Sequence, residues 1–237
     1  MQRGIVLSIS GQVSCSKVAG RQDGFDKSLF CLFCITGLEG NKNMEKKKQV
    51  LEVVCDQDVE TLLATAESSG AEAWMKLGLV YRQGEGVDRD VKKAWHWMER
   101  AADAGLAGAQ LCLGSWYDVG TDMGGEDFVK ASQWYQKAAE QGEQMAQFSL
   151  GKLYFEQKIG KGDFAKAVEW FEKSSAQGNL YARFTLAGCL VSGMGTKIDL
   201  VRAKTLLCQV VDEVGDEKDP LVQGAHQVIE VLENYGA

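Results

Sequence analysis

The sequence predicts an all-α fold in which helix pairs stack into a right-handed superhelix, an α-solenoid of about four units. Three observations lead to this prediction. Seven columns of residues recur in phase at steps of 36 or 37 residues, both blocks of the repeat have helical apolar spacing, and the 237 residues include one proline. With so few helix breakers, glycine must end most helices.

The first block of each unit is a predicted helix with small and apolar residues four positions apart. In the first unit these are Ala73, Leu77-Gly78 and Tyr81. The equivalent residues are Ala109, Leu113-Gly114 and Tyr117; Ala146, Leu150-Gly151 and Tyr154; and Ala182, Leu186-Ala187 and Leu190. Glycine inside a helix costs about 1 kcal/mol relative to alanine. We therefore expect a second helix to approach closely at Gly78 and its equivalents.

The second block of each unit is a predicted amphipathic helix that starts at an aspartate and ends at a glycine. In the first unit Asp90 is a predicted N-cap, Ala94 and Trp97 line the apolar face, and Gly105 suits the left-handed end position. The equivalent residues are Asp127, Ala131, Trp134 and Gly142; Asp163, Ala167, Trp170 and Gly178; and Asp199, Ala203, Leu206 and Gly215. We expect the tryptophans to be core residues that fill the space beside the alanines.

These boundaries predict four units, at residues 71–105, 106–142, 143–178 and 179–215. Residues 44–70 are a predicted degenerate helical repeat or N-terminal cap, and residues 216–237 a predicted C-terminal capping helix. Residues 1–43 do not fit the repeat and are predicted to be a poorly ordered extension. This extension could be a weak export signal, a disordered tail or an upstream mis-start, with Met44 as the first residue of the folded protein.

Charge and composition exclude several classes of function. Residues 1–50 carry a net charge of +4 and the remainder −11, which argues against nucleic acid as a ligand. No apolar stretch is long enough for a membrane span. Seven scattered cysteines favour reduced thiols over a disulfide framework. We expect a cytoplasmic monomer, or an exported protein if residues 1–43 contain a signal.

The repeat pattern A-x-x-x-L-G-x-x-Y, G-x-G-V-x-x-D and K-A-x-x-W-x-x-[KR]-A-A-x-x-G resembles the Sel-one-like repeat, a relative of the tetratricopeptide repeat. The first unit follows it at residues 73–81, 84–90 and 93–105, and the similarity covers residues 71–215. The fourth unit departs most, with Ala187, Leu190 and Leu206 in place of Gly, Tyr and Trp. The resemblance implies a scaffold or adaptor that binds a protein or peptide partner.

In related solenoids the variable positions of the first helices line a concave groove. Helical rotation away from the core positions selects twelve candidate groove residues in this sequence. They are Glu72, Lys76, Leu79, Gln83, Ser115, Val119, Met145, Ser149, Lys152, Glu156, Tyr181 and Thr185. Single apolar, charged and small residues of this kind suit recognition of a peptide or partner helix, although a solvated face has the same composition.

Other motifs give weaker hypotheses. The pattern Ser-x-x-Lys of penicillin-binding enzymes occurs at Ser14–Lys17 and Ser149–Lys152, without its companion motifs, so we expect no enzyme and no catalytic residue. Cys31-x-x-Cys34 lacks further zinc ligands, and His96 and His226 lie far apart, so we expect no metal and no cofactor. The alternative functions are a cell-wall-related hydrolase or binding protein, and a secreted effector that binds host proteins.

Overall fold

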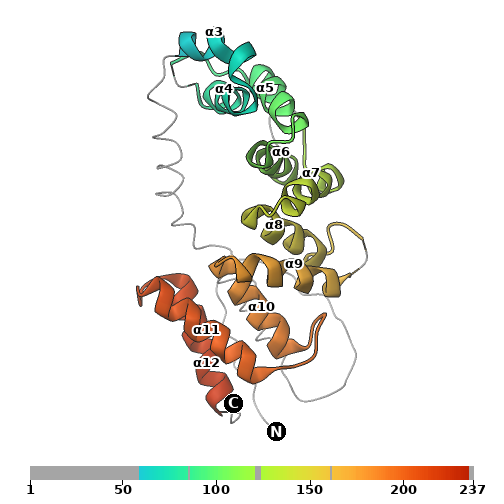
Figure 1. Cartoon of the computed structure of the whole chain (residues 1–237). Helices are drawn as coiled ribbons and strands as arrows, with labels where there is room; N and C mark the ends of the chain where they lie inside the picture. The colour runs from blue at the N-terminus through green and yellow to red at the C-terminus, as the bar shows by residue number, and fades with distance from the viewer. Residues whose placement is uncertain (1–58, 85, 121–123, 161, 235–237) are drawn as a thin grey trace.

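The computed structural model describes residues 59–84, 86–120, 124–160 and 162–234. These residues form ten α-helices that stack into a curved column (Figure 1). The helices are α3 (Val59–Ser69), α4 (Ala71–Gln83), α5 (Val91–Asp103), α6 (Ala107–Val119), α7 (Phe128–Glu140), α8 (Gln144–Phe155), α9 (Phe164–Ala176), α10 (Leu180–Ser192), α11 (Leu200–Val214) and α12 (Pro220–Asn234). The predicted N-terminal extension, residues 1–43, and residues 44–58 of the predicted cap lie outside the described residues.

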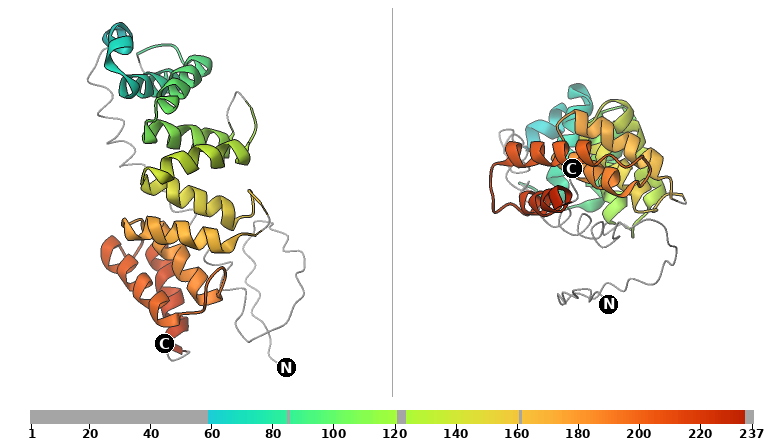
Figure 2. Two further views of the ribbon diagram at one scale, coloured as in Figure 1. Left: turned by 45° about the vertical axis from the view of Figure 1, so that its right-hand side comes forward. Right: turned by 90° about the horizontal axis from the view of Figure 1, so that it is seen from below.

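Each helix packs against the next along the chain, and the four pairs α4–α5, α6–α7, α8–α9 and α10–α11 form successive layers (Figure 2). The first helices α4, α6 and α8 lie on the inner side of the curve, and α5, α7 and α9 lie on the outer side (Figure 1). At the C-terminal end, α12 packs against α11 and α10. The predicted all-α solenoid of about four helix pairs is confirmed.

The helix ends follow the predicted local signals. The four N-cap aspartates each accept a hydrogen bond from the amide three residues later, as at Asp90 Oδ1, which lies 3.0 Å from Lys93 N. Asp127, Asp163 and Asp199 do the same for α7, α9 and α11. The four closing glycines have φ values between 65° and 92°. Both predicted signals are confirmed, because each depends only on residues within one turn of the helix end.

Glycines of the first helices permit close contact with a large side chain of the paired second helix. A Cβ at Gly114 would lie 2.5 Å from the Tyr135 ring, and one at Gly151 would lie 2.8 Å from the Phe171 ring. The predicted close approach is confirmed. Met98 at Gly78, and Tyr135 and Phe171 in the next units, fill this space, and each follows the tryptophan by one residue. Neighbouring residues of a helix point about 100° apart, so the tryptophan faces elsewhere.

The tryptophans contribute to packing between successive units. Trp97, Trp134 and Trp170, which we predicted to be core residues, are half-buried and pack against the buried core clusters. Trp134 packs against a buried cluster that includes Ala101 and Ala102 of the preceding unit. A cation on the next helical turn covers each ring, with Nζ of Lys137 lying 3.8 Å from the Trp134 centroid. The exposed face of the ring thus contacts a side chain instead of water.

Buried glutamines join neighbouring units, a feature that the sequence analysis missed. Gln110 Nε2 donates to Ala102 O at 3.1 Å, and Gln110 Oε1 accepts from Gln141 Nε2 at 2.8 Å. The next junction repeats this arrangement with Gln147, Ala139 and Gln177. Each of these carbonyls also accepts from the backbone N–H of the closing glycine, Gly105 or Gly142, so the glutamine is an additional donor at the end of the preceding second helix.

An equivalent hydrogen bond occurs before the first predicted unit. Trp74 Nε1 of α4 donates to Ala66 O of α3 at 2.6 Å, across the same separation of eight residues as the Gln110–Ala102 bond. Helix α3 thus makes the same kind of hydrogen-bonded contact with α4 that α5 makes with α6. It occupies the place of a second helix in a preceding unit.

We predict that Gly114→Ala lowers the free energy of unfolding, although alanine is the better helix former. Overpacking against Tyr135 costs about 1–3 kcal/mol, which exceeds the gain of about 1 kcal/mol in helix propensity. Urea unfolding followed by circular dichroism measures the difference. Gly108→Ala in the same helix is the control, because its Cβ would meet only the end of the Met75 side chain, whose sulfur lies at 3.3 Å and can shift by rotation, so little loss is expected. A stabilised Gly114→Ala variant would contradict the packing described.

Candidate functional site

The candidate site is the inner face of the column, formed by the first helices of successive units (Figure 1). Because the units repeat with nearly constant length, equivalent positions of α4, α6, α8 and α10 are brought to the same side of the stack. Helix α6 contacts α8 directly. Side chains from two different units can therefore meet on this face.

A buried tyrosine organises the middle of the inner face. The Tyr135 side chain extends from α7 to this face, and its hydroxyl donates to Asp118 Oδ2 of α6 at 3.3 Å. The side chains of Ser115 on α6 and Ser149 on α8 lie near this hydroxyl and act to lower its pKa. Burial, followed by the charge of Asp118, raises the pKa of Tyr135 above its usual range. The phenol is therefore a neutral donor at physiological pH.

An ion pair at the C-terminal end of α8, between Lys152 of the helix and Glu156 just after it, lies near Asp118. Lys152 Nζ is 3.8 Å from Glu156 Oε1, and the two side chains are 33% and 30% exposed. Burial raises the pKa of Glu156, the charge of Lys152 opposes this rise, and the charge of Asp118 adds to it. These groups form one arrangement, which we call the central cluster and define as Ser115, Asp118, Tyr135, Ser149, Lys152 and Glu156.

The central cluster brings together four of the twelve predicted groove residues, which are Ser115, Ser149, Lys152 and Glu156. The other eight are spread along the face. Exposed side chains occur at Glu72, Gln83, Val119 and Met145, and half-buried ones at Lys76, Leu79, Tyr181 and Thr185. The predicted positions therefore all retain some access to solvent. They do not form one continuous site.

Some predicted groove residues contribute to the fold. Leu79 packs against the buried cluster of the first unit. The Tyr181 ring lies 6.3 Å from the Phe148 ring, and Thr185 Oγ1 donates to Tyr181 O of its own helix at 2.8 Å. These three side chains have less surface to offer a partner than Val119, which is 74% exposed at the end of α6.

Sequence analysis missed Asp118 and Tyr135 of the central cluster. Asp118 lies three residues after Ser115 and so shares its helix face, which was an available signal. Tyr135 occupies the column of Met98 and Phe171, which are core residues, and only its hydroxyl distinguishes it. A polar group at the end of a core side chain needs a hydrogen-bonding partner, and here it finds one on the inner face.

The geometry does not support a catalytic Ser149–Lys152 pair. Lys152 Nζ pairs with Glu156 Oε1 at 3.8 Å, so its partner here is a carboxylate and not the Ser149 hydroxyl. A lysine acting as a base would need to be neutral beside the serine. The other Ser-x-x-Lys motif, at residues 14–17, lies outside the described residues.

The part of the chain that the structure describes contains neither a cluster suited to a metal ion nor a membrane-spanning helix. No group of three or more His, Cys, Asp or Glu side chains there could hold a metal ion. None of the described helices combines the length and the apolar character needed to cross a membrane. Cys31 and Cys34 fall outside these residues, whereas His96 and His226 are both exposed, on α5 and α12.

We predict that Lys152→Met raises the pKa of Glu156 further, because the ion pair is what opposes the effect of burial. Carbon-13 NMR titration of the carboxyl carbons measures this change. The pKa of Glu156 already lies above its unfolded value, so this carboxyl lowers stability at neutral pH. This loss of folding stability disappears as the pH falls through the folded-state pKa, because the buried carboxyl becomes protonated.

Lys166→Met is the matched control for this titration. Lys166 lowers the pKa of Asp163, the N-cap residue of α9, which lies three positions before it. The control substitution should raise the pKa of Asp163 and leave that of Glu156 unchanged. If Lys152→Met did not change the pKa of Glu156, the ion pair would have no role in the central cluster.

Comparison with known proteins places this geometry in a family. A family model described as Sel1 repeat matches residues 71–106, 107–143 and 144–179. A curated relative, the ERAD-associated E3 ubiquitin-protein ligase component HRD3A of Arabidopsis thaliana, is 36% identical over 83 residues. That match covers 35% of this chain and 12% of the relative.

Two solved structures share the fold. The crystal structure of a Sel1 repeat protein from Oxalobacter formigenes superposes with a TM-score of 0.60 at 26% identity, over 81% of this chain and 74% of that one. A protective antigen of uropathogenic Escherichia coli with an SLR fold gives a TM-score of 0.59 at 26% identity, over 73% and 44% of the two chains. Residues 71–179 therefore match three consecutive Sel1 repeats, and the chain shares the α-solenoid fold of these two solved Sel1-like repeat proteins.

Proposed function

We propose that this protein is a scaffold or adaptor that binds a peptide or protein partner along the inner face of its solenoid. The central cluster is the observation that carries this proposal. It presents hydroxyls, two carboxylates and a lysine from α6, α7 and α8 at one partly exposed place. Sel1 repeats generally mediate protein–protein interaction, which agrees with such a surface.

The inner face suits recognition by many small contributions. Its helices are fixed by the packing between units, so binding requires little ordering of the backbone. Val119 and Met145 add exposed apolar surface on α6 and α8 beside the polar cluster. A peptide or partner helix could place apolar side chains on these two residues and hydrogen-bond to the cluster.

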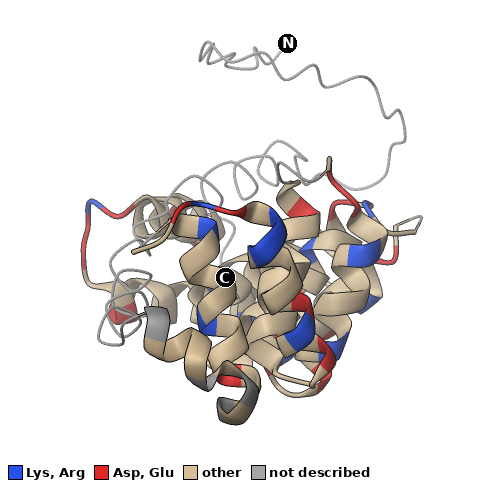
Figure 3. Ribbon diagram, turned by 90° about the horizontal axis from the view of Figure 1, so that it is seen from above, with Lys and Arg blue, Asp and Glu red and all other residues tan. Residues whose placement is uncertain are grey.

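The distribution of charge favours a protein over a nucleic acid. Figure 3 shows, for the described residues, Lys and Arg interspersed with Asp and Glu along the helices. Nucleic-acid binding requires clustered basic side chains, whereas residues 51–237 carry a net charge of −11. The scattered cysteines support our further proposal of a cytoplasmic, monomeric adaptor.

The relative from Arabidopsis thaliana suggests the kind of process. Its description names it as a component of an ERAD-associated E3 ubiquitin-protein ligase, and therefore as a member of a multiprotein assembly. The matched segment is a small part of that relative. We carry over only the role in assembling a complex, and no ligase activity.

We predict that Ala substitution of Ser115, Ser149, Lys152 and Glu156 together strongly reduces partner capture. The experiment uses the full chain as bait in a native lysate, with quantitative mass spectrometry of the captured proteins. Loss of the cluster should reduce a specific partner at least about tenfold, which corresponds to about 1.4 kcal/mol. Circular dichroism must show that the variant retains its helices.

The matched control substitutes four exposed residues of the outer helices, Lys92, His96, Gln133 and Glu169, by Ala. This variant also removes one lysine, one glutamate and two polar side chains. It should capture the partner as the unsubstituted protein does. Equal capture by all three proteins would place binding elsewhere and reject the inner-face proposal.

A further inference from the structure

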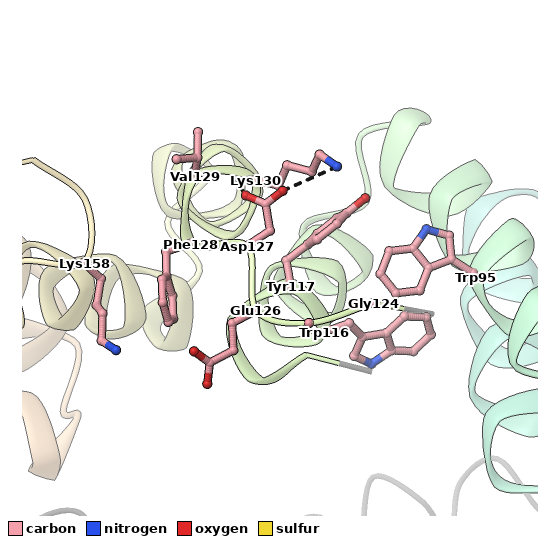
Figure 4. A pocket seen from close by; sticks show the side chains of 11 residues that line it. Trp95, Trp116, Tyr117, Gly124, Glu126, Asp127, Phe128, Val129, Lys130 and Lys158 are labelled. Atoms are coloured by element: carbon pink, nitrogen blue, oxygen red, sulfur yellow. Dashed lines mark hydrogen bonds and ion pairs between the residues drawn. The ribbon is translucent and has the colours of Figure 1, made fainter. Parts of the chain in front are cut away.

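A second candidate site lies at the edge of the column formed by the turns within units. It is a pocket of about 630 Å³ (Figure 4). Its walls come from three units: Trp95 on α5, Trp116 and Tyr117 on α6, Phe128 at the start of α7, and Lys158 in the turn after α8. The lining includes none of the residues of the central cluster.

Aromatic rings form the walls of the pocket. Trp95 lies 5.4 Å from Trp116 at an interplanar angle of 47°, and 5.0 Å from Tyr117 at 87°. Figure 4 shows these three rings on one side and Phe128 on the other. Trp95 Nε1 donates to Glu99 at 2.7 Å, which holds its indole in place. The rings therefore present preformed aromatic walls with tilted and edge-on faces, in a recess whose lining also includes polar groups.

The charges around the pocket are already balanced. Its lining contains two lysines, Lys130 and Lys158, and two carboxylates, Glu126 and Asp127. Lys130 Nζ pairs with Asp127 at 3.4 Å, and Lys158 Nζ lies 4.3 Å from the Phe128 centroid. A net charge on a ligand therefore gains no overall attraction from these groups.

Cations from the chain itself already occupy the ring faces. The guanidinium carbon of Arg82 lies 4.4 Å from the Trp116 centroid, and Lys130 Nζ lies 5.2 Å from that of Tyr117. With Lys158 over Phe128, three of the four rings carry a cation. A further cation would meet their repulsion, so a neutral group is the electrostatic match.

The rim of the pocket leaves room for a partner. Gly124 and Gly125 line it, neither has a positive φ, and a Cβ at either would meet no atom within 4 Å. Neither the backbone conformation nor the packing of the fold requires glycine at these positions. Val129 on the same rim is 61% exposed. These features suit an inserted side chain with its backbone resting on the rim.

We propose that this pocket receives one aromatic side chain from a segment of a partner protein. A neutral ring fits the balanced charges and can add edge-on contacts to the existing rings, which are worth about 0.5–1.5 kcal/mol beyond the buried area. Aromatic anchors in preformed pockets are the residues that contribute most at protein interfaces. This proposal does not depend on partner binding at the inner face.

Ligand-observed NMR on the full chain tests the pocket with small probes. N-acetyl-phenylalanine amide and N-acetyl-tryptophan amide should show saturable binding, and the leucine, lysine and glutamate analogues much weaker binding. Trp95→Ala, which removes a wall, should reduce the affinity of the aromatic probes about tenfold. Gly125→Leu should also reduce it while leaving every wall in place, which keeps the test valid if Trp95→Ala unfolds.

The matched controls separate this site from the rest of the molecule. Val129→Ala should weaken probe binding. Val201→Ala, at the equivalent second position of α11 and 69% exposed, should not. The inner-face variant of Ser115, Ser149, Lys152 and Glu156 should bind the probes normally, so failure of one proposal is distinguishable from failure of the other. Absent binding, equal binding of the leucine or lysine analogue, or affinity unchanged in both Trp95→Ala and Gly125→Leu would overturn the proposal.

Discussion

The close contact between the two helices of each unit is the constraint on which the rest of the structure depends. Gly78, Gly114 and Gly151 allow a Met, Tyr or Phe of the second helix to lie against the backbone of the first. This contact turns the tryptophan one residue earlier toward the preceding unit. Packing within a unit thereby sets the packing between units, and the repetition of both sets the curve of the column.

The inner face and the aromatic pocket follow from departures from this regular pattern. Tyr135 is the one of these three side chains with a hydroxyl, and that group reaches the inner face and donates to Asp118 of α6. The turn after α6 is one residue longer than the turn after α4, and its glycines border the pocket. A regular scaffold thus supplies rigidity, and single substitutions within it supply the chemistry that a partner could recognise.

Local features of the fold were predictable from sequence because their causes lie within a few residues. The N-cap of Asp90 and the left-handed end at Gly105 need no knowledge of neighbouring units. The glutamine bonds and the Tyr135 hydrogen bonds were not predictable, because they join residues of different units or depend on which side of the helix faces them. Trp95 was overlooked for a related reason. The equivalent residues Ser132, Val168 and Lys204 form no aromatic column, so periodicity gave no signal.

The most direct test of the central claim is native-state hydrogen exchange of the Gly151→Ala variant, compared residue by residue with the unsubstituted protein. If contacts within and between adjacent units hold the column together, protection should fall in α8 and α9 and less so in α7 and α10. Protection in α4 and α5 should stay unchanged. A uniform fall across all helices would contradict the account, because it would show that the column unfolds as one unit and not through coupling between neighbours.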